Sequence, residues 1–105
     1  MVNTMKVEDI VKIFKDNATT NKNDSRQIIK NNNNVKYNNE IGIVLSNIDN
    51  STFEVFIHAK INNEIISQLF YSTFNNIDEA NKYYNKLEKF IIDFNLEGII
   101  GEIKN

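Results

Sequence analysis

The segment from residue 41 to residue 74 constrains the fold more than any other part of the chain. It contains three runs rich in β-branched and aromatic residues, Ile41–Ile48, Thr52–Ile61 and Glu64–Phe74, and only short polar connections separate them. Runs of this length and composition are typical of β-strands. We therefore predict three successive strands that pair as an antiparallel meander.

Two connections that contain Asn predict how these strands pair. Asn accepts the positive backbone angles that both central residues of a type I′ hairpin turn require, so Asn62-Asn63 is expected to form such a turn. That turn places Phe56 opposite Leu69. A second turn at Asn50-Ser51 would place Leu45 opposite Phe56.

The predicted register gives the sheet two faces of unequal character. The better core face carries Gln68 and the apolar side chains of Val44, Ile48, Phe53, Val55, Ile57, Ala59, Ile61, Ile66, Phe70 and Phe74. The other face, called here the mixed face, carries Ile41, Ile43, Leu45, Phe56, Ile65, Leu69 and Tyr71 among the polar residues Asn47, Glu54, His58, Lys60 and Ser67. The solvent face of an antiparallel sheet is ordinarily polar, so the mixed face is too apolar to be simply solvated.

Apolar residues spaced three and four apart predict a helix on each side of the strand region. The first helix is expected at about Thr4–Lys15, with Asn3 or Thr4 as its cap. The second is expected at about Ile77–Phe94, with Asn76 as its cap. We expect the remaining residues, 95–105, to form a short strand or a docked tail.

Residues 16–40 are the least regular part of the sequence, and they include the tract Asn31–Asn34. One interpretation is a short strand at Arg26–Lys30, a loop through the Asn tract and a strand that resumes at Val35. A helical turn that begins near Asp24 and simple mobility are the alternatives. Long structureless loops are uncommon inside compact domains, so we expect a partly ordered excursion that contains a short edge strand.

These elements together predict an α+β fold in a single domain over residues 1–105. A chain of this length can bury a core without covalent cross-links. It contains no Cys and a single His, which excludes disulfides, thiolate nucleophiles and Cys-ligated metal sites. We therefore expect no metal and no cofactor.

His58 is the natural candidate for a general base, because it is the only histidine in the chain. In the predicted register it lies opposite Ser67, with Glu54 and Glu64 as the nearest acids. No glycine-rich turn or nucleophile elbow accompanies Ser67, so a complete catalytic set is missing. We expect a protein that is not an enzyme.

The mixed face is the strongest functional indication in the sequence. Monomeric proteins rarely expose large apolar patches, so this face is expected either to bind a partner or to be covered within the chain. Two structural alternatives would cover it, namely helices divided between the two faces, or the tail and residues 16–40 folded over it. As a binding face it would use Ile43, Leu45, Phe56, His58, Ile65, Leu69 and Tyr71, and its partner would be another protein or, as a homodimer, a second copy of the chain.

Nucleic-acid binding is the alternative function. Lys22, Arg26, Lys30 and Lys36 make the first third of the chain locally basic. The helix–three strands–helix order is also that of the double-stranded-RNA-binding domain. However, the second predicted helix begins with Asp78 and Glu79 where phosphate contacts would need basic residues, and the net charge is −2.

No leader peptide or membrane span is evident in the sequence, so a cytoplasmic location is expected. The abundance of Asn, Ile and Lys is the composition that an AT-rich genome favours. A small acidic chain of this kind resembles, in composition alone, the accessory and inhibitor proteins of bacteria, phages and plasmids.

Overall fold

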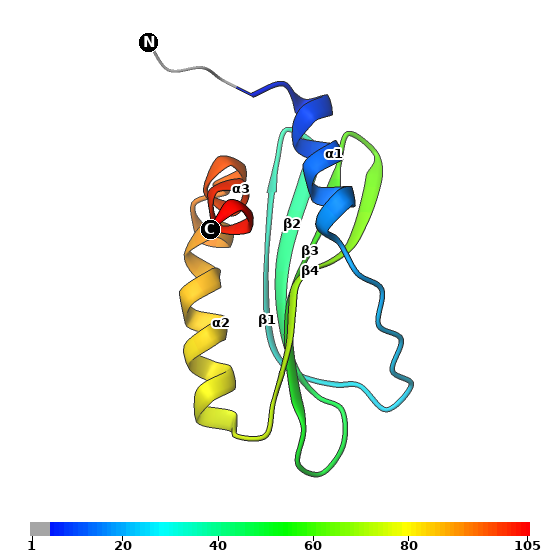
Figure 1. The fold of residues 1–105 in the computed structure, drawn as a ribbon, viewed down its shortest axis with the longest axis vertical. Helices are drawn as coiled ribbons and strands as arrows, with labels where there is room; N and C mark the ends of the chain where they lie inside the picture. Colours follow the sequence, from blue (N-terminus) through cyan, green and yellow to red (C-terminus); the bar gives the residue numbers. More distant parts are fainter. Residues whose placement is uncertain (1–4) are drawn as a thin grey trace.

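The computed structural model describes residues 5–105 and contains four strands and three helices. Figure 1 shows a helical layer, formed by α2 and α3, beside a twisted sheet. The elements in chain order are α1 (Val7–Asn17), β1 (Gln27–Lys36), β2 (Asn39–Asn47), β3 (Phe53–Ile61), β4 (Glu64–Phe74), α2 (Ile77–Ile92) and α3 (Leu96–Lys104). The expected α+β class is confirmed, with one strand more than the three-stranded meander that the sequence predicted.

The four strands form one antiparallel sheet in the order β1-β2-β3-β4, so β1 and β4 are its two edges. One face of the sheet and all three helices share a single hydrophobic core. The sheet contributes residues such as Ile43 and Ile57, and the helices contribute Phe14, Leu87 and Ile99, all of them at most 1% exposed.

The turn at Asn62-Asn63 is confirmed, since both residues have positive φ angles of 54° and 64°. Next to the turn the pairing is the predicted one, with Lys60 opposite Ile65. Farther along, β4 carries an extra residue in each of two places, so Leu69 lies opposite Ile57 and not opposite Phe56 as predicted. Such bulges are common on edge strands.

The predicted register of β2 on β3 is wrong by one residue. A two-residue turn at Asn50-Ser51 was expected, but the connection runs from Ile48 to Thr52. The Asp49 carboxylate accepts hydrogen bonds from the backbone N–H groups of Ser51 and Thr52, both at 2.8 Å, and holds this wider loop. Leu45 consequently lies opposite Val55 and not opposite Phe56.

A one-residue slip turns every side chain of a strand to the other face of its sheet. Ile41, Ile43 and Leu45 therefore join the helix-covered core face, and none of them is exposed. Val44 moves to the opposite face, where it pairs with Phe56. The mixed face that the sequence predicted does not exist in that form.

The Asn tract lies inside a ten-residue strand and not in a loop, which corrects the interpretation of residues 16–40. A two-residue turn at Tyr37-Asn38, with φ angles of 53° and 65°, connects β1 to β2. The two strands then pair from Lys36 back to Gln27. The ladder thus pairs the backbone groups of Asn32 and Asn34 with β2. The amide of Asn32 donates to Glu88, and that of Asn34 donates to the Ile91 carbonyl of α2, at 3.1 and 2.9 Å.

The helix ends differ from the predictions in detail. The Asn76 side chain caps α2 as expected, but residues 95–105 form helix α3 where a strand or tail was predicted. Phe94, with φ 49°, ends α2, and the Asn95 side chain then accepts a hydrogen bond from the N–H of Gly98 and begins α3. The proposed caps of α1, Asn3 and Thr4, lie outside the described residues; α1 begins after Lys6, whose side chain makes no capping hydrogen bond.

The Asn62-Asn63 turn provides a test of the hairpin geometry. Replacing Asn63 by Val should lower the free energy of unfolding by about 1–2 kcal/mol, because a β-branched residue is strained at positive φ. Replacing it by Gly, which accepts positive φ freely, should be close to neutral. Urea unfolding measures both values, and equal midpoints for the two variants would contradict a left-handed conformation at residue 63.

Candidate functional site

The face of the sheet that lies away from the helices is called here the outer face, and it carries Val44, Ser46, Glu54, Phe56 and His58. The connection between α1 and β1, residues 18–26, crosses this face and is called here the crossing segment (Figure 1). It starts at the β4 edge and ends at β1. The predicted alternative, in which the tail and residues 16–40 cover the mixed face, holds only in part: the crossing segment lies over part of the outer face, whereas the tail forms α3 in the helical layer.

Buried polar side chains hold the crossing segment at both of its ends. At the β4 edge, the N–H of Thr19 donates to the Gln68 carbonyl at 2.8 Å, and the N–H of Asn21 donates to the Gln68 side chain at 2.7 Å. At the other end, the Arg26 guanidinium donates hydrogen bonds to the Glu54 carboxylate. Gln68 and Glu54 are only 5% and 0% exposed. Two buried polar side chains of the sheet thus bind this segment.

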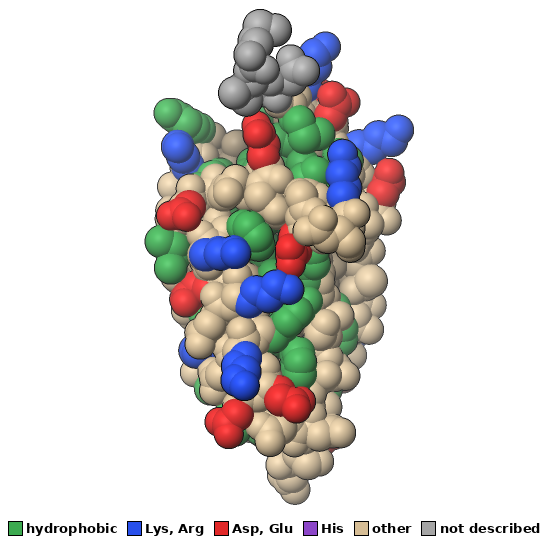
Figure 2. Space-filling view, turned by 60° about the vertical axis from the view of Figure 1, so that its left-hand side comes forward, with side chains coloured by type: hydrophobic (Ala, Val, Ile, Leu, Met, Phe, Trp, Pro, Cys, Tyr) green, Lys and Arg blue, Asp and Glu red, His purple; other side chains and the backbone are tan. Residues whose placement is uncertain are grey.

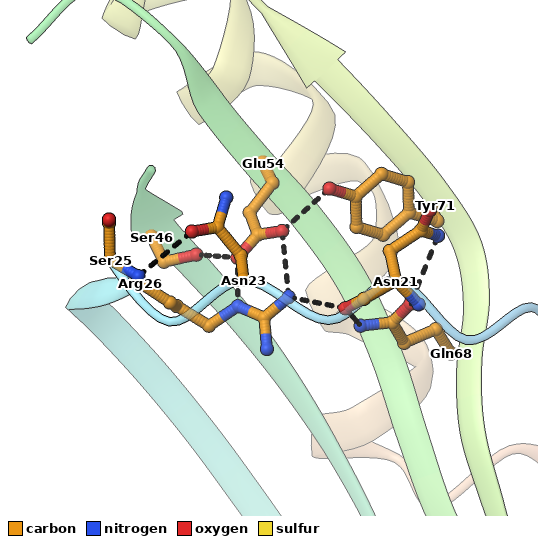
Figure 3. Close-up of polar contacts among 8 residues, drawn as sticks. All are labelled: Asn21, Asn23, Ser25, Arg26, Ser46, Glu54, Gln68 and Tyr71. Carbon is orange, nitrogen blue, oxygen red and sulfur yellow. Dashed lines mark hydrogen bonds and ion pairs between the residues drawn. The ribbon is translucent and has the colours of Figure 1, made fainter. Parts of the chain in front are cut away.

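Glu54 is the centre of the polar cluster in Figure 3. Arg26 donates to both carboxylate oxygens, from Nε to Oε2 and from Nη2 to Oε1 at 3.0 Å. Ser46 donates its hydroxyl to Oε2, and Tyr71 donates its hydroxyl to Oε1 at 2.7 Å. Arg26 also stacks over Phe56, with Cζ 5.2 Å from the ring centre.

The surroundings of Glu54 favour its ionised form. Burial alone raises the pKa of Glu54, but the hydrogen bonds from Arg26, Ser46 and Tyr71 outweigh burial and hold the pKa below its ordinary value. Burial and the hydrogen bond to Glu54 raise the pKa of Tyr71 to about 12, so its hydroxyl keeps its proton and acts as a donor. The cluster is therefore an ion pair with two neutral donors.

This cluster is built to hold the chain together. Four hydrogen bonds from three side chains occupy both oxygens of Glu54, and no part of this residue is exposed. Breaking such a pair is costly, because a charge would be left buried. A substrate would have to displace Arg26 to reach the carboxylate. We interpret the cluster as the fastening of the crossing segment.

His58 lies farther along the outer face, above Gly42. A Cβ atom at Gly42 would collide with the imidazole of His58 and with the Asn33 side chain, so glycine provides the space that the ring occupies. Burial lowers the pKa of His58, and the charge of Glu40 only partly opposes this effect. The predicted partner of His58 was Ser67, but the structure gives no hydrogen bond between them.

A pocket opens beside each end of α3. One, of about 390 Å³, is lined by Phe70, Tyr71 and Glu102 together with residues at the end of α1. The other, of about 330 Å³, lies between Tyr37, Phe94 and the start of α1. Among residues 5–105, no group of three or more metal-ligating side chains is brought together.

The structure separates the seven residues that the sequence assigned to a partner-binding face. Ile43, Leu45 and Leu69 are fully buried in the core beneath the helices. Phe56 is on the outer face but lies under Arg26 and is 6% exposed. Tyr71 and His58 are partly exposed, and only Ile65, at 75%, is open to solvent.

The four basic residues of the alternative function are also dispersed. Arg26 is bound to Glu54, and the ammonium group of Lys30 lies over the Tyr84 ring at 4.4 Å, on the helix side of the sheet. Lys36 is at the end of β1, and Lys22 is in the crossing segment. On the face in Figure 2, basic and acidic side chains alternate without an area of one sign.

Among residues 5–105, no segment pairs with the outer edge of β1. In an antiparallel ladder, every second residue directs its N–H and C=O toward the neighbouring strand. Lys36 and Asn39 flank the two-residue turn and form a hydrogen-bonded pair, so the even-numbered residues from Lys30 to Lys36 face β2. The backbone groups of Asn31, Asn33 and Val35 therefore point outward from the sheet.

Exposed apolar side chains gather along this same edge. Seven large apolar residues among the described ones are exposed, and four of them lie on β1 or its turn, namely Ile28, Ile29, Val35 and Tyr37. Ile28 and Val35 are 58% and 63% exposed. The opposite edge, β4, is different, because Thr19 pairs with Gln68 and bulges interrupt the strand. The β4 edge is thus covered at Gln68 and interrupted by bulges, whereas the β1 edge is open among residues 5–105.

Comparisons with known proteins place no constraint on these observations: no family model, no curated protein and no solved structure gives a significant match to this chain. Within residues 5–105, no helix has the length and apolar character that crossing a membrane requires.

The sequence did not predict the Arg26–Glu54 pair, and the short edge strand expected at Arg26–Lys30 corresponds only to the first part of β1. Glu54 was visible as a carboxylate in an apolar strand, but the register error placed Ser46 and Glu54 on different faces. The basic residue that pairs with it lies 28 positions away, and no local spacing links the two. The rest of this edge strand was not predicted, because the Asn tract was interpreted as a loop.

The Glu54 cluster can be tested by removing its charge. Replacing Glu54 by Gln should lower the free energy of unfolding by about 2–3 kcal/mol, because Arg26 loses a charged, bidentate partner. The matched control is Glu64→Gln, which breaks the exposed ion pair with Lys15 and should cost less than about 1 kcal/mol. Chemical unfolding measures both, and similar losses would contradict the role of the buried pair.

The same variant should change how stability depends on pH. The folded-state pKa of Glu54 lies below its ordinary value of 4.5, so its contribution is complete above pH 4.5 and is lost as the pH falls through the folded-state value. The difference in stability between the wild type and Glu54→Gln should thus be constant above that pH and shrink below it. Urea titrations at several pH values measure this difference. A difference that grew toward acid pH would contradict the assignment.

Proposed function

We propose that this chain is a small, non-enzymatic protein-binding domain that pairs the open edge of β1 with a strand of another polypeptide. The observation that carries the proposal is the coincidence, on one edge strand, of outward-pointing backbone groups at Asn31, Asn33 and Val35 with exposed apolar side chains. Strand addition uses both features, because main-chain hydrogen bonds supply affinity and alternate side chains supply specificity.

The edge has the properties that strand addition needs. β1 is ten residues long, and from Lys30 to Lys36 its pairing with β2 is regular, so the outward groups are evenly spaced. The two amides Asn32 and Asn34 fasten β1 to α2 and hold the strand in place before a partner arrives. A pre-ordered edge loses little conformational freedom on binding.

The proposal keeps the kind of function that the sequence indicated and changes its location. The expected surface was an apolar sheet face, and the helices occupy much of that area. Protein edges are ordinarily protected by prolines, bulges or a covering segment, since they otherwise pair with other chains. Here the crossing segment pairs with β4 at Gln68. Among the described residues, the edge of β1 that points away from β2 has no such cover.

Replacing Asn33 by Pro tests the edge directly. Its N–H points outward, so proline removes a donor from the edge without removing a hydrogen bond to β2. Binding of a polypeptide at this edge should weaken about tenfold or more, because one backbone bond is lost and the ring blocks close approach. The measurement is capture from a native extract, and from a purified untagged copy of the chain, by immobilised protein.

The matched control is Asn33→Ala, which removes the same side chain but keeps the N–H. A bound polypeptide that the wild type and Asn33→Ala retain, and that Asn33→Pro loses, is the expected result. Far-UV circular dichroism confirms that both variants fold. Equal retention by the two variants would place the binding surface elsewhere on the molecule.

A further inference from the structure

We propose that the polypeptide at the β1 edge is a second copy of this chain, paired antiparallel with its own β1 so that Asn32 lies on the two-fold axis. This inference rests on the proposed function, because it names the partner of the same edge. The result would be one continuous eight-stranded sheet with both α2 helices on the same face.

The alternation of backbone groups restricts the possible registers. Only Asn31, Asn33 and Val35, and the start of the strand before them, present outward N–H and C=O groups. Hydrogen-bonded pairs across the interface must therefore join odd-numbered residues of one copy to odd-numbered residues of the other. The two-fold axis must then pass through a residue and not between two neighbours.

One register matches the side chains. With Asn32 on the axis, Asn31 pairs with Asn33 of the second copy, and Val35 meets the bulged pair Ile28-Ile29. By symmetry this apolar contact forms twice, once at each end of the interface. It covers side chains that are 58%, 48% and 63% exposed in a single copy.

The neighbouring registers lose this match. An axis through Asn31 places Val35 opposite Gln27 and the start of the strand opposite Asn33. An axis through Asn33 places Val35 opposite Asn31, and it places Ile29 opposite Tyr37, which lies in the turn beyond the end of the partner's strand. Both registers leave Val35 facing a polar residue, Gln27 or Asn31, so burial of Val35 favours the register on Asn32.

The charges fit the same register. Lys30 lies opposite Asn34 of the second copy, and its diagonal neighbours across the interface are Asn32 and Lys36 of that copy. Asn32 is the diagonal neighbour of Lys30 across the interface, and its amide already bonds the Glu88 carboxylate at 3.1 Å. Long side chains reach diagonal neighbours, so Lys30 of one copy lies within reach of Glu88 of the other. β1 itself carries two lysines and no carboxylate, so Glu88 of α2 is the group that offsets their like charge in this arrangement.

A cysteine on the axis tests the partner and the register together, because the natural chain has no cysteine. In the proposed register the two copies of residue 32 form a non-hydrogen-bonded pair with Cα atoms about 4.5 Å apart, which suits a disulfide. Asn32→Cys should therefore form a covalent dimer under mild oxidation. The matched control Asn33→Cys should stay monomeric, because its two copies lie two residues out of register.

A second measurement keeps the test independent of the Asn32 side chain and its bond to Glu88. A mixture of Asn31→Cys and Asn33→Cys should give the mixed disulfide in preference to either homodimer. Light scattering of the wild type should give twice the chain mass of 12.2 kDa, and Asn33→Pro should give the single mass. A cross-link of Asn33→Cys without one of Asn32→Cys would overturn the register.

The outcomes separate this inference from the function on which it rests. A wild type that stays monomeric up to millimolar concentration, with no disulfide in Asn32→Cys, would overturn the self-pairing. If an extract polypeptide were still retained by Asn33→Ala and lost by Asn33→Pro, the edge function would stand with a different partner. Loss of both results would overturn both proposals.

Discussion

The connection between β2 and β3 decides which side of β2 belongs to the core, and most of the structure follows from that choice. Asp49 holds a five-residue loop from Ile48 to Thr52, and this length sets Leu45 opposite Val55. Ile41, Ile43 and Leu45 consequently line the same face as Ile57 and Leu69. That face is apolar enough to hold three helices, whereas the face with Ser46 and Glu54 is not.

The polar character of the outer face in turn explains the path of the crossing segment. Glu54 is a buried carboxylate that needs a positive partner, and the extended segment supplies that charge and two hydrogen bonds through Arg26 at its end. Because the segment passes the β4 edge on its way, Gln68 and Thr19 also close that edge. One sheet edge is thus protected as a consequence of how the outer face is covered.

The β1 edge stays open for the same topological reason. The crossing segment ends where β1 begins, so among residues 5–105 it does not extend past the edge of that strand. Its inner side chains are used to bind α2, through Asn32, Asn34 and the contact of Lys30 with Tyr84. The outward backbone groups and the apolar side chains of Ile28 and Val35 stay exposed, and the proposed strand pairing would use them. In this fold, the β4 edge is partly covered by the crossing segment, and the β1 edge is a regular strand that its Asn side chains bind to α2.

The sequence by itself determined the α+β class, the hairpin at Asn62-Asn63, the extents of β3, β4 and α2, and the cap at Asn76, because each depends on residues close together in the chain. It did not determine the register of β2, the strand formed by the Asn tract, or helix α3. These depend on a loop length, on hydrogen bonds from a neighbouring strand, and on burial against the core, and such long-range terms outweigh local propensity. The Arg26–Glu54 pair and the open β1 edge were decided by tertiary structure alone, since each arises where distant segments meet or fail to meet.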